Sequence, residues 1–198
     1  MKIKNLAAMV RSCRNIDLIN TRDSQGAIVR QHVLLNGRAI FPLDGMQPIT
    51  PETLLTIADA EEDKRDLYGV RQVDMSSYMA RMVDDYQEDD LTAKMGEVNL
   101  ETRQEKLLSI HTDNGKETHF LPVAMLKPVR DARQLNLVIR KTVGEGRVIV
   151  ALDGVVHIAT FATYKAWAND ETVEELHRVW LKAKELAKEN EQKESESS

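Results

Sequence analysis

Two histidines come nearest, among the side chains of this sequence, to the types and spacing of a reactive site. His111 and His119 flank the turn Asp113-Asn114-Gly115, and on the two strands of a hairpin they would be able to approach each other. A carboxylate from Asp113 or Glu117 would complete a zinc-type ligand set. This spacing is not diagnostic, and we interpret both histidines as surface residues of an exposed hairpin. A metal-dependent hydrolase is therefore our third hypothesis.

Other groups with chemical potential fit structural roles better. Cys13 is the single cysteine and stands at helical spacing with apolar neighbours, which favours a small core residue over a nucleophile. The pairs Asp84-Asp85 and Asp89-Asp90 lack the spacing of an EF-hand and indicate a solvated acidic loop. Gly144-Glu145-Gly146 lacks the further glycine of a dinucleotide-binding loop. We expect no catalytic residue, no metal and no cofactor.

Composition places the chain among ordinary globular proteins. Its 198 residues, 42% of them hydrophobic, suffice for one domain with a core. No apolar run approaches the ~20 residues of a membrane span, and the short apolar patch at the N-terminus does not resemble a signal peptide. One cysteine excludes an intramolecular disulfide framework. We expect a cytoplasmic protein with no membrane partner.

The net charge of −5 conceals a segregation of charges along the chain. Residues 1–45 and residues 120–165 each hold seven Lys or Arg and three Asp or Glu. Residues 46–119 hold eight basic and seventeen acidic residues, and residues 166–198 hold five and nine. Two basic blocks thus alternate with two acidic ones, so a polyanion partner for the basic blocks stays open despite the overall negative charge. Ordinary solvated helix faces would explain the same pattern.

The two basic blocks share an order of predicted elements. The first predicts a helix over 2–14 and strands over 16–20, 27–35 and 38–41; the second predicts a short helix over 122–133 and strands over 135–139, 147–152 and 155–161. Asn36-Gly37 and Asp153-Gly154 are tight-turn signals between the last two strands of each block. Arg130 and Arg133 follow Arg11 and Arg14 at the same interval of 119 residues. The pattern predicts a structural duplication.

We therefore predict an α+β fold in which two similar helix-plus-antiparallel-hairpin units form a sheet with helices on one face, plus a C-terminal helix. A single domain would span 1–165, with repeat units at about 2–45 and 120–165 and an acidic insertion at 46–119. The C-terminal helix would span 166–190, beginning near 170, and the tail 191–198 would be disordered. That helix carries an apolar stripe that would pack on the sheet, mediate dimerisation or bind a partner groove.

The insertion carries weaker signals. Thr50-Pro51 marks a helix start, and 70–75 has the composition of a strand. Residues 76–95 suit an amphipathic helix that ends in an acidic loop. A hairpin is expected between 106 and 123.

The arrangement of residues 2–45 and 120–165 resembles the repeating subdomain of DNA sliding clamps. In that family the helices line the inner surface of a ring and meet the phosphate backbone without sequence specificity. The resemblance implies a nucleic-acid-binding surface composed of Lys2, Lys4, Arg11, Arg14, Lys127, Arg130 and Arg133. This chain departs from the family because it has one pair of units, so a ring would require oligomerisation, and because the acidic insertion has no counterpart. In style it also resembles uncharacterised proteins of prophages and mobile elements.

The first functional hypothesis is a non-enzymatic binding protein: a clamp-like, DNA-associated or oligomeric accessory protein of a bacterial mobile element. Contacts with the backbone of double-stranded DNA are expected, because only three Phe, four Tyr and two Trp are available for stacking on bases. The alternative hypothesis is a protein–protein interaction module, or an acidic DNA-mimic regulator, acting through residues 61–119.

Overall fold

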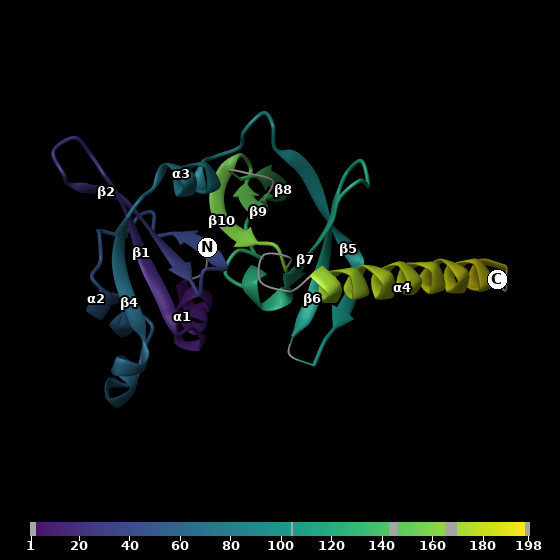
Figure 1. The fold of residues 1–198 in the computed structure, drawn as a ribbon, viewed down its shortest axis with the longest axis horizontal. Coiled ribbons are helices and arrows are strands. Elements are labelled where there is room, and N and C mark those ends of the chain that lie inside the picture. The colour runs from purple at the N-terminus through teal and green to yellow at the C-terminus, as the bar shows by residue number, and fades with distance from the viewer. Residues whose placement is uncertain (1–2, 104, 143–145, 165–169, 197–198) are drawn as a thin grey trace.

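The computed structural model describes residues 3–103, 105–142, 146–164 and 170–196 (Figure 1). Its strands are β1 (Asn15–Arg22), β2 (Ile28–Leu35), β3 (Ala39–Pro42), β4 (Gly69–Asp74), β5 (Leu91–Glu101), β6 (Lys106–Thr112), β7 (Thr118–Pro122), β8 (Leu135–Lys141), β9 (Arg147–Asp153) and β10 (Val156–Ala162). Its helices are α1 (Ile3–Ser12), α2 (Pro51–Ile57), α3 (Ser77–Val83) and α4 (Asp170–Glu196), with the 3₁₀ helices η1 (Glu62–Leu67) and η2 (Val123–Leu126). The predicted α+β class is confirmed.

The strands form one ten-stranded mixed sheet in the order β4-β1-β2-β3-β10-β9-β8-β5-β6-β7. In its centre the triplet β1-β2-β3 meets the reversed triplet β10-β9-β8, and β3 pairs antiparallel with β10 through Ile40 and Thr160. The two triplets are therefore related by an approximate two-fold rotation about the seam between β3 and β10. The two predicted units lie in one sheet, while their common origin stays a prediction.

A tight-turn contact recurs in both triplets. Asn36 has φ 48° and Gly37 has φ 67°, as the Asn-Gly pattern predicts for this turn. The Asn36 side chain accepts a hydrogen bond from the backbone N–H of Asn15 at 3.0 Å. In the second triplet the Asp153 carboxylate accepts from the N–H of Gln134 at 2.9 Å. Each side chain ties its turn to the start of the first strand of its own triplet.

The predicted helix over 122–133 is wrong in length and type. Only η2, with four residues, is helical there, and turns follow as far as Asp131. Pro128 explains the difference, because proline lacks the N–H of an α-helical bond and its ring clashes with the carbonyl four residues earlier. Pro128 is buried, so the interruption belongs to the packed part of the molecule.

Residues 46–119 are woven into the sheet. β4 pairs in parallel with β1, while β5 and β6 extend the sheet beyond β8. β5 was not predicted, because its sequence mixes exposed charged residues with Gly96. That glycine lies where a Cβ would stand 2.1 Å from the Ser109 hydroxyl and 2.4 Å from the His111 ring, so the strand requires a residue without a side chain at this point.

The C-terminal helix is longer than predicted. α4 runs to Glu196, which contradicts a disordered tail over 191–196; residues 197–198 lie outside the described residues. Val173 and Trp180 are buried, and Trp180 packs with Phe120 and Leu107 of the sheet. The rest of α4 runs away from the body of the molecule (Figure 1).

Two hydrophobic cores cover opposite faces of the central sheet. The larger packs Leu6 and Val10 of α1, Leu54 of α2 and Leu126 of η2 against the sheet. The smaller core packs α3 against the other face through Met82, Val83, Ile40, Val138, Val148, Val150 and Leu152. We call the face that packs against α1, α2 and η2 the helix face. We call the opposite face, which carries α3 and the loop 84–90, the loop face. No helix in the described part of the chain is long and apolar enough to cross a membrane.

Candidate nucleic-acid interface

The two segments that carry the predicted basic surface lie side by side on the helix face. Leu6 of α1 and Leu126 of η2 are buried in the same core. The Asn5 side-chain amide donates a hydrogen bond to the Lys127 carbonyl at 2.8 Å, although 122 residues separate them in sequence. The packing thus brings the two basic segments together, as the arrangement of the sequence predicts.

The predicted cations of this surface are exposed and unpaired. Lys2 lies outside the described residues. Those described are Lys4, Arg11, Arg14, Lys127, Arg130 and Arg133. Not one of the six takes part in an ion pair within the described ranges, whereas ion pairs hold Arg22, Arg30, Lys64, Arg71, Arg81, Lys94, Lys106, Arg140, Arg147 and Arg178. We call these six residues the cationic surface.

Arg11 and Arg14 are held in place by uncharged groups. The Arg11 guanidinium donates to the Ala58 carbonyl at 2.5 Å, and the Arg14 guanidinium lies 5.8 Å from the centre of the Tyr68 ring. Tyr68 in turn donates its hydroxyl to the Arg11 carbonyl. Neither a carbonyl nor an aromatic ring neutralises a cation, so both side chains keep their charge while losing mobility.

A groove beside η2 extends the cationic surface towards β5 and β6. It measures about 430 Å³, and Lys106, Lys127 and Arg130 are among the residues that line it. Lys106 is partly offset by Glu101 at 3.6 Å. On the opposite side the cationic surface ends where Asp59 and the acidic η1 follow Ala58. The cations therefore form a bounded patch.

The histidine pair His111 and His119 is not brought together. In the β6–β7 register His119 stands opposite Ile110, so the two rings project from opposite faces of the hairpin. The His111 ring lies 4.8 Å from the Trp180 ring, while His119 contacts Glu117 at 3.2 Å. The described residues contain no group of three or more His, Cys, Asp or Glu able to hold a metal.

Cys13 lies in the larger hydrophobic core. Burial raises the pKa of its thiol, which disfavours the thiolate that a nucleophile needs. The structure thus agrees with a packing role for this residue.

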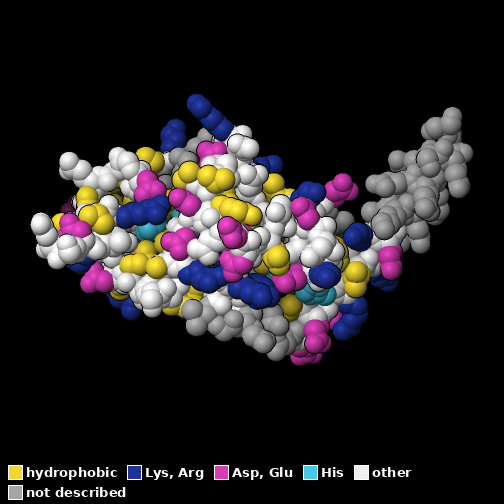
Figure 2. All heavy atoms as spheres, turned by 90° about the horizontal axis from the view of Figure 1, so that it is seen from above, with side chains coloured by type: hydrophobic (Ala, Val, Ile, Leu, Met, Phe, Trp, Pro, Cys, Tyr) yellow, Lys and Arg dark blue, Asp and Glu magenta, His cyan; other side chains and the backbone are white. Residues whose placement is uncertain are grey.

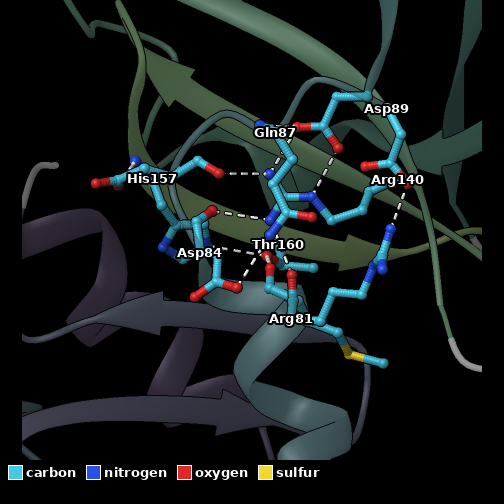
Figure 3. A network of polar contacts seen from close by, with 10 residues as sticks. Arg81, Asp84, Gln87, Asp89, Arg140, His157 and Thr160 are labelled. Atoms are coloured by element: carbon cyan, nitrogen blue, oxygen red, sulfur yellow. Dashed lines mark hydrogen bonds and ion pairs between the residues drawn. The ribbon is translucent and has the colours of Figure 1, made fainter.

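Sequence reasoning missed a buried charge network at Arg140. This side chain is 1% exposed and forms a two-pronged ion pair with Asp90, with both N···O distances at 2.7 Å. It also donates to the carbonyls of Arg81, Asp84 and Asp85 (Figure 3). An arginine directly after the apolar run Leu137–Ile139 was the available signal. Its charge counts towards the second basic block but is not available at the surface.

Two buried histidines lie on the loop face nearby. His32 and His157 are 0% and 1% exposed, and their ring centres are 6.1 Å apart. Burial lowers the pKa of His32 to about 4 and that of His157 to about 3. His157 shares a hydrogen bond with Thr160 at 2.9 Å. Both rings are therefore neutral near pH 7.

Comparison of the chain with protein-family models, with curated proteins and with solved structures gave no match.

Proposed function

We propose that this protein is a non-enzymatic factor that binds the phosphate backbone of double-stranded DNA, without base specificity, through the cationic surface. The observation that carries the proposal is the absence of ion pairs at all six described cations of this surface. Most other arginines of the described chain are held by carboxylates. Cations that are not neutralised within the protein can neutralise DNA phosphates and so release the counterions bound there.

Backbone contacts fit this surface better than base stacking. Tyr68 is an aromatic residue beside these cations, and the Arg14 guanidinium already lies over its ring. Single-strand binders stack successive bases on exposed aromatic side chains. A duplex, which offers two rows of phosphates and keeps its bases stacked, is therefore the better ligand.

A clamp-like role extends the proposal. The two triplets meet at one seam, and α1 and η2 lie on the same face, which supports the resemblance to sliding clamps, although η2 is a four-residue 3₁₀ helix where the resemblance implies a second basic helix. A ring would require several copies, and β4 ends the sheet as a largely exposed edge strand to which another copy could pair. Service as an accessory protein of a mobile element, in the cytoplasm, is the setting we propose for such a factor.

The test is fluorescence anisotropy with a labelled random-sequence DNA duplex at low and moderate salt. Lys4→Glu combined with Arg130→Glu reverses two cations whose side chains form no hydrogen bond or ion pair in the described chain. Lys64→Glu combined with Arg178→Glu changes the net charge equally at η1 and α4 and serves as the control. We expect the first variant to lose at least about tenfold in affinity and the control to bind like the wild type.

Equal binding by both variants, or no binding by the wild type, would remove the proposal. Far-UV circular dichroism of all three proteins establishes that the fold is intact.

The alternative function is a protein–protein interaction through residues 61–119. The acidic residues of the loop 84–90 favour it over a DNA mimic. A mimic would present carboxylates in extended rows like phosphates, whereas these carboxylates lie in one short loop that also exposes Tyr86.

A further inference from the structure

The loop 84–90, between α3 and β5, is exposed but rigidly held. Arg140 restrains the loop, because its guanidinium donates hydrogen bonds to the carbonyls of Asp84 and Asp85 and to the carboxylate of Asp90. Asp85 also accepts a hydrogen bond from the backbone N–H of His157 at 2.8 Å. The outward side chains of this loop are therefore displayed on a fixed backbone (Figure 3).

Exposed apolar side chains gather beside this loop. Tyr86, Met95 and Val155 are 48%, 50% and 65% exposed, and all three line one groove of about 700 Å³ with Val138 and Leu152. The Tyr86 N–H donates to the Val155 carbonyl at 3.0 Å, which joins the loop to the β9–β10 turn. We call this the loop-face groove.

The loop beside the groove is acidic, whereas the charged residue that lines the groove itself, Lys94, is paired with Asp113. Asp84, Asp85 and Glu88 are exposed, and no cation stands within ion-pair distance of them in the ranges that the structure describes. Asp89 is paired with Arg81 and, like Asp90, is already neutralised. The loop lies at the top of Figure 1, and Figure 2 views that side, where hydrophobic and acidic side chains lie together in the middle of the molecule with Lys and Arg side chains beside them.

We propose that the loop-face groove binds a segment of a partner protein that combines apolar and basic residues. Its apolar side chains would cover Tyr86, Met95 and Val155, because contiguous exposed apolar surface marks interaction sites. Its lysines or arginines would meet Asp84, Asp85 and Glu88. Asp84 accepts a hydrogen bond from the Gln87 side chain and Asp85 accepts one from the His157 N–H, but no ion pair joins these carboxylates to a cation of the described chain. The fixed backbone lowers the entropic cost of binding, since little of the groove has to be ordered.

This inference rests on the alternative function. Met95 and Leu135 line both this groove and the groove beside η2, but Tyr86 and Val155 line only the loop-face groove, and none of the six cations lines it. Variants of one surface should leave the other activity unchanged. The two proposals can therefore fail separately.

The experiment measures binding of a fluorescein-labelled synthetic peptide of alternating leucine and lysine to the full chain. Tyr86→Ser with Val155→Ser removes the apolar contacts, and Asp84→Asn with Glu88→Gln removes the charges. Val29→Ser with Leu67→Ser, and Glu62→Gln with Asp63→Asn, are matched controls at other exposed sites. We expect each groove variant to weaken binding at least about fivefold and the controls to bind like the wild type.

Several outcomes would overturn the proposal. Equal binding by groove variants and controls would show that the peptide adheres without a site. A leucine–glutamate peptide that binds as tightly would show that the acidic residues do not select a basic partner. An all-lysine peptide that binds as tightly would show that the apolar side chains of the groove do not contribute. Sedimentation that shows wild-type dimers, but a monomeric Tyr86→Ser Val155→Ser variant, would make a second copy the occupant and contradict a partner protein.

Discussion

The helix face and the loop face differ in how their charges are used. On the helix face, six cations form no ion pair within the described chain, and two of them, Arg11 and Arg14, contact uncharged groups. On the loop face, Arg140 is buried in an ion pair with Asp90, and Arg81 pairs with Asp89. These two cations are therefore neutralised within the protein, and other carboxylates of the loop stay exposed to solvent. A charge count along the chain treats Arg130 and Arg140 alike. The comparison teaches that internal ion pairing decides which charges a surface can offer to a partner.

Removing the buried arginine is expected to have the largest effect. Arg140→Met leaves Asp90 buried without a cation and frees three carbonyls, and we expect a loss of about 3–5 kcal/mol in the free energy of unfolding. Arg22→Met, which breaks the exposed pair with Asp74, should cost less than about 1 kcal/mol. Urea denaturation of both variants measures the contrast. Similar costs would mean that the Arg140 network does not organise the loop face.

Acid should destabilise the loop face through its histidines. The folded-state pKa values of His32 and His157, about 4 and about 3, lie below the ordinary value of 6.5. Between pH 6.5 and pH 4 these two histidines bind protons mainly in the unfolded chain. The stability that the neutral buried rings contribute is therefore fully present above pH 6.5 and is lost as the pH falls towards 4. At pH 5 each buried ring should lower the free energy of unfolding by about 2 kcal/mol relative to pH 7.

The check is thermal and urea unfolding of the wild type and His32→Leu between pH 7 and pH 4.5. Other groups that face these rings are Arg30, Asp44 and Arg140. The variant should lose about half of the pH dependence in this range. An unchanged pH profile would contradict a neutral buried His32.

A smaller effect concerns the salt dependence of the helix face. Each phosphate neutralised contributes about −0.9 to the slope of log affinity against log salt concentration. Lys127→Gln should therefore reduce the magnitude of the slope for duplex DNA by about 1, whereas Lys94→Gln, which breaks a surface pair with Asp113, should leave it unchanged. Titrations between about 50 and 200 mM salt provide the slopes. Equal slopes would show that Lys127 meets no phosphate.

Local rules explain the parts of the fold that were predicted. Asn36-Gly37 forms a turn with positive φ at both residues, and the Thr50 side chain caps α2 by accepting from the Thr53 N–H, with Pro51 in the first turn. In both cases the geometry follows from the residues themselves. The positions of the two basic segments could likewise be read from charge, but periodicity gave the correct element only for α1.

Tertiary contacts explain what was missed. β5 was not recognisable because its pairing with β6 and β8, rather than its own alternation, makes it a strand. The burial of the Arg140 side chain depends on its ion pair with Asp90, which lies fifty residues away in the sequence. The loop-face groove likewise joins Tyr86 to Val155, which no local pattern connects.

The most direct test of a division between the two faces is amide NMR of the full chain, titrated with the DNA duplex and, separately, with the leucine–lysine peptide. We predict that the duplex shifts amides of α1 and of residues 123–133, and that the peptide shifts amides of 84–95 and 154–156. Duplex-induced shifts centred on residues 84–95, or one shared set of shifted amides for both ligands, would contradict the account.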